Sequence, residues 1–138
     1  MKKLNCVLLI DDNVNDNFFH TISIKEADAA LQIKTATDGE KALEYLENCK
    51  ENTGQYPFPD LIFLDINMPK INGFEFLEKA KERKLIDDSK PVIIIMLTSS
   101  LNPSDEQIAK EKFSNEIKNF KNKPLTVEMI NEIIEKYF

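Results

Sequence analysis

Five polar side chains of complementary chemistry stand at or near the ends of short apolar segments: Asp11, Asp12, Asp65, Thr98 and Lys123. If the three carboxylates converge, their mutual repulsion leaves one of them protonated unless a cation lies among them. Oxygen ligands of this kind favour Mg²⁺, which keeps several waters and completes its coordination with phosphate. No histidine or cysteine is placed to favour zinc. The residue types therefore indicate a magnesium site that handles phosphate.

Formation of an acyl phosphate on Asp65 is the reaction that this set supports. The carboxylate and the incoming phosphoryl group are both anionic, so Mg²⁺ and the ammonium of Lys123 would offset the repulsion between them. The Thr98 hydroxyl can donate to a further phosphoryl oxygen. Asp65 is the expected nucleophile because it stands alone at the end of a central strand, whereas Asp11 and Asp12 form the pair suited to hold metal.

These side chains need a sheet that brings the strand ends together. Apolar runs without polar alternation are typical of parallel strands that are covered on both faces. The expected strands are Cys6–Ile10, Ile33–Ala36, Leu61–Leu64, Val92–Leu97 and Glu116–Phe120. Amphipathic stretches separate them, which predicts an α/β fold of five strands and five helices, doubly wound in the order 2-1-3-4-5. In that order the first and third strands are neighbours, so Asp11, Asp12 and Asp65 should meet.

The first helix is expected to place Val14, Phe18, Ile22 and Ala29 on one face, with His20 on its surface. The segment 37–40, Thr-Asp-Gly-Glu, matches a capping box at the start of the second helix.

Gly73 stands near the start of the third helix, and Phe76, Leu77 and Ala80 share its apolar face. Asn102 and Pro103 resemble a cap followed by proline at the first position of the fourth helix, which has few apolar residues. The fifth helix carries a strong apolar pattern, at Val127, Ile130, Ile133, Ile134 and Tyr137.

Composition narrows the functional classes. The 138 residues carry a net charge of −6 and no visible basic patch, which argues against direct binding of nucleic acid. No apolar run is long enough to cross a bilayer, and the first residues lack the length and cleavage site of an export signal, so a cytoplasmic protein is expected. Cys6 and Cys49 make neither a disulfide framework nor a metal site.

Taken together and in order, the strand-end motifs resemble the response-regulator receiver family of two-component signalling. The resemblance covers nearly the whole chain. The matching segments are 7–12 (VLLIDD), 61–69 (LIFLDINMP), 73–77 (GFEFL), 94–100 (IIMLTSS) and 123–125 (KPL). The resemblance implies a flavodoxin-like fold in which Asp65 is the phosphoacceptor, Asp12 a direct metal ligand and Asp11 its partner, often through water.

The resemblance implies further roles. The backbone carbonyl of Asn67 would bind Mg²⁺, and Thr98 and Lys123 would contact the phosphoryl group. Phe120 matches the aromatic switch position, with phenylalanine in place of tyrosine. The Lys123–Pro124 bond is expected to be cis. Asn67 and Ser100 match the positions that tune the lifetime of the phosphoryl group.

The resemblance also implies partners. A histidine kinase or a histidine phosphotransfer protein would phosphorylate the chain, which would then switch its binding to a downstream protein; a homodimer is compatible with this arrangement. Residues 1–138 are expected to be a single receiver domain without an output domain, and a signalling protein rather than an enzyme. The segments 50–60 and 101–115 are similar to those of single-domain regulators that partner bacterial phytochromes.

Other interpretations remain open at this point. Asp11 and Asp12 could simply cap the first helix, Lys123 could be a solvated lysine, and Phe120 could be an ordinary core residue. A phosphatase of the haloacid dehalogenase type uses a similar residue set, but it has an early D-x-D nucleophile motif, whereas here the acidic pair comes first and Asn67 follows Asp65. A pseudo-receiver that only binds protein is the third alternative.

Overall fold

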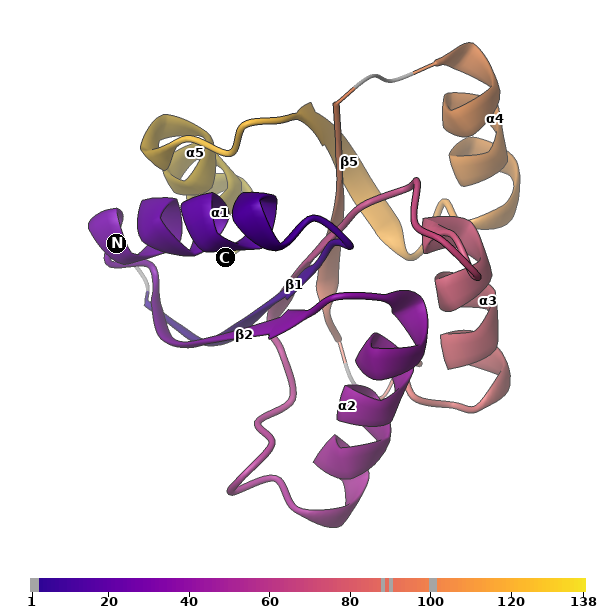
Figure 1. The fold of residues 1–138 in the computed structure, drawn as a ribbon, viewed down its shortest axis with the longest axis horizontal. Coiled ribbons are helices and arrows are strands. Elements are labelled where there is room, and N and C mark those ends of the chain that lie inside the picture. Colours follow the sequence, from indigo (N-terminus) through magenta and orange to yellow (C-terminus); the bar gives the residue numbers. More distant parts are fainter. Residues whose placement is uncertain (1–2, 88, 90, 100–101) are drawn as a thin grey trace.

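The fold was obtained as a computed structural model that describes residues 3–87, 89, 91–99 and 102–138. Over these residues, five strands alternate with five helices (Figure 1). The strands are β1 (Leu4–Ile10), β2 (Ala30–Ala36), β3 (Leu61–Leu64), β4 (Ile93–Thr98) and β5 (Ile117–Asn122). The helices are α1 (Val14–Glu26), α2 (Gly39–Glu51), α3 (Gly73–Glu82), α4 (Pro103–Lys112) and α5 (Val127–Tyr137).

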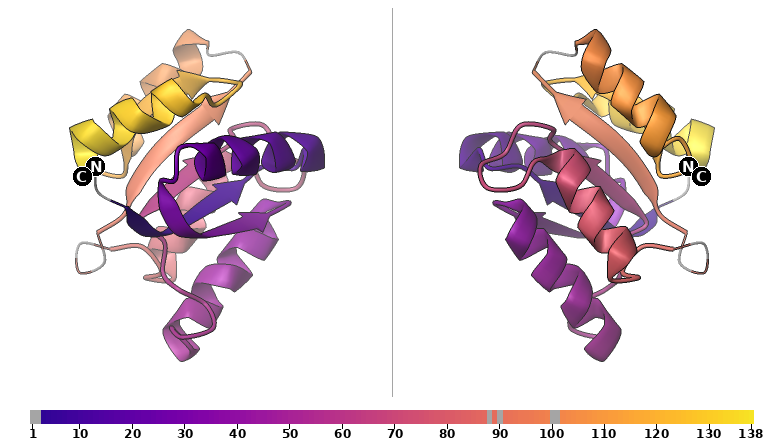
Figure 2. Two further views of the ribbon diagram at one scale, coloured as in Figure 1. Left: turned by 90° about the vertical axis from the view of Figure 1, so that its left-hand side faces the viewer. Right: turned by 90° about the vertical axis from the view of Figure 1, so that its right-hand side faces the viewer.

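All neighbouring strands pair in parallel, in the order β2-β1-β3-β4-β5. The predicted doubly wound α/β fold is therefore confirmed. Helices α1 and α5 cover one face of the sheet, and α2, α3 and α4 cover the other (Figure 2). All strands run the same way, so their carboxyl ends lie along a single edge of the sheet.

Each face of the sheet has its own apolar core because successive strand residues point to opposite faces. In β1, Leu8 and Ile10 belong to the core under α2, α3 and α4, whereas Val7 and Leu9 belong to the core under α1 and α5. β3 is buried at every position, as its unbroken apolar sequence predicts. The central strands are thus held from both sides, which fixes the position of the residues that follow them.

Helix α1 departs from the sequence-based expectation. Its predicted apolar face is largely turned to solvent, with Val14 66%, Phe18 60% and Ile22 37% exposed. Asn17, His20 and Ile24 form the buried face instead, so the surface position expected for His20 was wrong. Asn17 donates from Nδ2 to the backbone carbonyl oxygen of Asp11 at 2.9 Å, and this bond fixes a rotation that the apolar pattern alone does not predict.

The starts of the remaining helices depend on side-chain caps. The capping box expected at 37–40 is wrong: Asp38 is the cap of α2, and its carboxylate accepts from the backbone N–H of Lys41 at 2.7 Å. A capping box does occur at α3, between Asn72 and Glu75. The expected cap of α4 is confirmed, with Asn102 as the cap and proline at the first helical position.

The described chain begins and ends at the amino ends of the strands. β1 starts at Leu4, and the backbone N–H of Leu4 donates to the carbonyl oxygen of Ala29 at 2.8 Å. At the other end of the chain, the Tyr137 hydroxyl donates to the carbonyl oxygen of Lys118, near the start of β5, at 3.2 Å. Among the described residues, no helix combines the length and the apolar character that crossing a membrane requires.

Candidate functional site

Backbone hydrogen bonds extend the sheet up to the polar residues at its carboxyl edge. The N–H of Asp11 donates to Ala36 at 3.1 Å, and the N–H of Asp65 donates to Ile10 at 2.9 Å. On the far side, the N–H of Lys123 donates to the carbonyl oxygen of Thr98 at 2.8 Å. The predicted site residues therefore follow directly from strand register rather than from a flexible loop.

The three carboxylates converge as predicted. One oxygen from each of Asp11, Asp12 and Asp65 lies within 4.8 Å of the other two. Asp11 and Asp65 are buried, at 4% and 6% exposed, and Asp12 is exposed. This donor set fits Mg²⁺, because it consists of hard oxygen ligands with one exposed member through which water and phosphate can approach.

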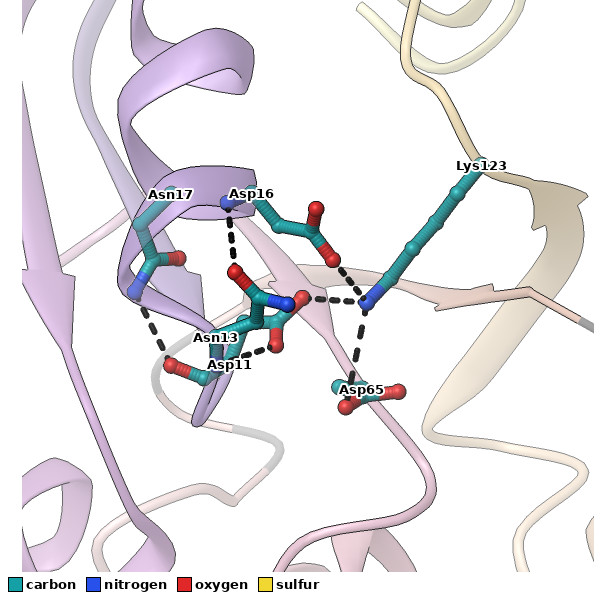
Figure 3. A network of polar contacts seen from close by, with 6 residues as sticks. All are labelled: Asp11, Asn13, Asp16, Asn17, Asp65 and Lys123. Atoms are coloured by element: carbon teal, nitrogen blue, oxygen red, sulfur yellow. Dashed lines mark hydrogen bonds and ion pairs between the residues drawn. The ribbon is translucent and has the colours of Figure 1, made fainter.

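Lys123 points toward Asp11, Asp16 and Asp65 and forms an ion pair with each of them (Figure 3). Its Nζ is 2.5 Å from Asp11, 2.9 Å from Asp16 and 3.8 Å from Asp65, and its side chain is only 14% exposed. It is thus no solvated lysine. Burial alone would lower the pKa of Lys123, but its hydrogen bonds to Asp11 and Asp16 outweigh that effect and raise the pKa, so the ammonium stays charged.

Asp65 has an unusual affinity for protons. Burial raises its pKa to about 7, and the negative charges of Asp11 and Asp12 act in the same direction. Lys123 and the backbone at Asn67 oppose the rise but do not cancel it. In the absence of a metal ion, Asp65 therefore gains and loses its proton near neutral pH rather than near pH 4.

The remaining predicted residues that the structure describes lie on β4 and β5 or in the segment after β3. Thr98 ends β4 and is 1% exposed, and Asn67 is exposed two residues after Asp65. Phe120 on β5 is half-buried against the core under α2, α3 and α4. The Lys123–Pro124 bond is cis, as expected. Ser100, expected to tune the lifetime of the phosphoryl group, lies outside the described residues.

Sequence reasoning missed a set of α1 residues that support the site. Asn13, not Asp11 or Asp12, is the cap of α1: its side chain accepts from the N–H of Asp16 at 3.0 Å. The N–H of Asn13 in turn donates to Oδ1 of Asp11 at 2.9 Å. The capping alternative for the acidic pair is therefore wrong. An asparagine followed three residues later by an acid was the available signal, because that spacing is typical of a helix start.

Asn17 and His20 lie beneath the acids on the inner face of α1, where they line a small space together with Asp11 and Asp65. His20 is 3% exposed, and burial lowers its pKa, which favours the neutral ring. The side-chain oxygen of Asn17 is buried without a hydrogen-bond partner among the described residues. These polar groups explain why α1 turns this face inward.

Gly73 allows α3 to begin directly against the strand end that carries Asp65. A Cβ at this position would lie 2.5 Å from the carbonyl oxygen of Asp65 and 3.1 Å from Cε of Met96. The first of these distances is too short for any real side chain. The N–H of Gly73 also donates to the carbonyl oxygen of Ile66 at 2.8 Å, which closes the loop after β3.

Comparison with known proteins agrees with this geometry. Residues 7–135 match the response regulator receiver domain family. A crystal structure of a two component response regulator from Cytophaga hutchinsonii is 31% identical, covers 98% of this chain and 97% of that one, and has a TM-score of 0.84. The structure of the bacteriophytochrome response regulator AtBRR is 29% identical, covers 97% and 92% of the two chains, and has a TM-score of 0.70.

A curated relative places the same kind of sequence within a longer protein. The chain is 32% identical over 105 residues to a probable cyclic di-GMP phosphodiesterase of Vibrio cholerae. The match covers 76% of this chain but only 21% of the length of that relative.

Proposed function

The chain belongs to the response regulator receiver domain family of two-component signalling, and we propose that Asp65 is the residue on which it accepts a phosphoryl group. One observation carries this assignment: Asp65 shares a pocket with Asp11 and Asp12, and its Oδ2 lies 3.8 Å from the ammonium of Lys123. The three acids can hold a divalent cation and Lys123 adds a fixed ammonium, so the site can offer positive charge to an anionic substrate.

The transfer step follows from this arrangement. A carboxylate oxygen of Asp65 attacks the phosphorus of a phosphohistidine, the phosphorus–nitrogen bond breaks, and its electron pair stays on the imidazole nitrogen. Lys123 pairs with a phosphoryl oxygen, and the Thr98 hydroxyl donates to another. A protonated Asp65 cannot attack, so the acid must lose its proton first.

Asp11, Asp12, Asp65 and the backbone carbonyl of Asn67 would hold the magnesium ion that the family uses. When bound, Mg²⁺ supplies positive charge that offsets the repulsion between the carboxylate and the phosphoryl group. The same charge favours the ionised form of Asp65, because a nearby cation lowers the pKa of a carboxyl group.

Phosphorylation would then bias a two-state equilibrium. Thr98 moves toward the phosphoryl group, and Phe120 turns into the space that Thr98 leaves. The half-buried position of Phe120 supports this movement, because the ring is only partly fixed by packing. Helix α4 supports it too: within its described residues only Ala109 is buried, so little apolar contact holds the helix in place.

The donor in this proposal is a histidine kinase or a histidine phosphotransfer protein, and the output is a changed affinity for a downstream protein in the cytoplasm. The likeness to a bacteriophytochrome response regulator favours a sensor kinase of that kind as the input. In this proposal the chain acts as a single receiver domain and as a switch. Its own chemistry is limited to slow self-phosphorylation and slow self-dephosphorylation.

Phosphorylation by a small donor tests the assignment. The protein is incubated with phosphoramidate and Mg²⁺, and its intact mass is followed over time. The wild type and Asp28→Asn should gain one phosphoryl group, because the Asp28 side chain is 80% exposed and pairs with Lys3 rather than with the site. Asp65→Asn should gain none. Labelling of Asp65→Asn would refute the assigned acceptor, and rapid turnover of phosphate esters would favour a phosphatase instead.

A further inference from the structure

Asp16 is an acid that the strand-end pattern does not include, yet it contacts the central cation of the site. It lies in the first turn of α1, and its Oδ2 is 2.9 Å from Nζ of Lys123 (Figure 3). On the basis of the proposed function, we propose that Asp16 is a positioning residue that holds Lys123 ready for the phosphoryl group. It touches neither the phosphoryl group nor the metal in this role.

The geometry around Nζ of Lys123 carries the argument. An ammonium has three N–H donors. Two carboxylates, of Asp11 and Asp16, lie at hydrogen-bond distance from it, at 2.5 and 2.9 Å. Asp65 lies at 3.8 Å, beyond hydrogen-bond range. One donor is therefore left for the side of Asp65, and a phosphoryl group attached to Asp65 could place one of its oxygen atoms as the partner of this donor.

Asp11 cannot hold Lys123 alone during the reaction. Its carboxylate belongs to the group of three that would bind the metal, and a divalent cation competes with the ammonium for the same oxygen atoms. The like charges of the metal and the lysine also repel each other. Asp16 stands outside that group of three, so it keeps its hold on Lys123 when Asp11 turns to the metal.

Asp16 is itself held in place by the start of the helix. Its backbone N–H donates to the side chain of Asn13, and the N–H of Asn13 donates to Asp11. The side chain of Asp16 is 33% exposed and that of Lys123 is 14% exposed, so solvent reaches the ion pair mainly at Asp16. Asn13 thus links Asp16, which holds the lysine, to Asp11, which belongs to the metal group.

An acid in the first turn of a helix also has an ordinary role, because it stabilises the positive end of the helix dipole. Asp105 provides the matched control for that role. It lies at the corresponding position of α4, and its backbone N–H donates to the capping side chain of Asn102 at 3.0 Å, as that of Asp16 does to Asn13. Asp105→Asn should therefore lose the same helix stabilisation without affecting Lys123.

The test measures the rate of phosphorylation by phosphoramidate at saturating Mg²⁺. Asp16→Asn should react about tenfold more slowly than the wild type, the order expected for one charge-assisted hydrogen bond. Asp16→Glu should restore part of the rate, and Asp105→Asn should match the wild type. The concentration of Mg²⁺ that gives half the maximal rate should change by less than about twofold in Asp16→Asn, because Asp16 does not hold the metal.

A double-mutant cycle decides whether the effect runs through the lysine. In a Lys123→Gln background, adding Asp16→Asn should change the residual rate by less than about twofold, since the group to be positioned is gone. An equal loss in both backgrounds, an unchanged rate in Asp16→Asn, or a shift confined to the Mg²⁺ requirement would each overturn the proposal. Labelling of Asp65→Asn would instead overturn the proposed function, so the two failures are distinguishable.

Discussion

The side-chain amide of Asn17 donates to the backbone carbonyl oxygen of Asp11 at 2.9 Å and so ties α1 to the end of β1. Both residues are buried, at 4% exposed each. This bond does two things at once: it satisfies a carbonyl group that has left the sheet, and it sets the rotation of the helix that presents Asp16 to Lys123.

Removal of this amide should destabilise the protein. We expect Asn17→Ala to lower the free energy of unfolding by about 1–2 kcal/mol, because the carbonyl oxygen of Asp11 loses its partner. Asn15→Ala is the control: Asn15 is exposed on the same helix, and both substitutions gain the same helix propensity. Urea denaturation measures both variants, and equal stability of the two would contradict the role given to Asn17.

Because the pKa of Asp65 is raised, this residue should make the stability of the metal-free protein depend on pH. The folded-state pKa of about 7 lies above the ordinary value of 3.8, so between these values the folded protein binds more protons than the unfolded chain. The stability of the wild type should therefore fall as the pH rises through this window. Asp65→Asn lacks this dependence, so its stability relative to the wild type should be more favourable at pH 8 than at pH 4. After a discount for screening by solvent, we expect a difference of about 1–3 kcal/mol.

Chemical denaturation in the presence of a chelator measures this difference. Saturating Mg²⁺ should reduce the advantage of Asp65→Asn at pH 8, because the ion stabilises the ionised carboxylate of the wild type. An advantage that does not change between pH 4 and pH 8 would show that Asp65 titrates as an ordinary surface acid.

His20 should titrate below the usual range. Burial lowers its pKa, and the charge of Lys123 acts in the same direction, whereas the charges of Asp16 and Asp11 oppose the shift. As the single histidine of the chain, it gives one unambiguous ring resonance. In the native protein, NMR should show a midpoint below 6.5, with the ordinary midpoint restored in denaturant. The same shift means that His20 lowers the stability as the pH falls below 6.5, since the unfolded chain then binds the extra proton.

Gly73 should be the least replaceable glycine near the site. Gly73→Ala places a methyl group against the carbonyl oxygen of Asp65, so we expect a loss of about 1–3 kcal/mol in stability and slower phosphorylation as that strand end shifts. Gly54→Ala is the control, because the nearest atom to its added Cβ is Oδ1 of Asn52 at 3.5 Å. Denaturation and phosphoramidate labelling test both variants. A Gly73→Ala variant with the stability and the labelling rate of the wild type would show that α3 can move away without loss.

The sheet and the centre of the site could be predicted from the sequence because both depend on backbone register. Unbroken apolar runs identify parallel strands, and parallel strands bring their following residues to one edge. Asp11, Asp12 and Asp65 meet for that reason alone. β3 matched its expected bounds at both ends, whereas β2 extends from Ala30 rather than from Ile33.

The rotation of α1 could not be predicted because apolar periodicity assumes that the apolar face is the buried one. Here Asn17 and His20 face inward next to the acids, while Phe18 and Phe19 are each 60% exposed. The polar contacts that reverse the usual preference join α1 to residues outside the helix: Asn17 to Asp11, and Asp16 to Lys123. A periodic pattern within one helix carries no information about such partners.

The position of the chain ends has a practical consequence for experiments. Leu4 and the carbonyl that pairs with Tyr137 both lie at the amino ends of the strands, whereas Asp65 and Lys123 follow the carboxyl ends. A fluorophore or a surface tether attached beyond Phe138 would sit a full strand length away from the acids. A sample immobilised there would thus present Asp65, the proposed acceptor, to a phosphodonor in solution, and an attached reporter would lie away from that edge of the sheet.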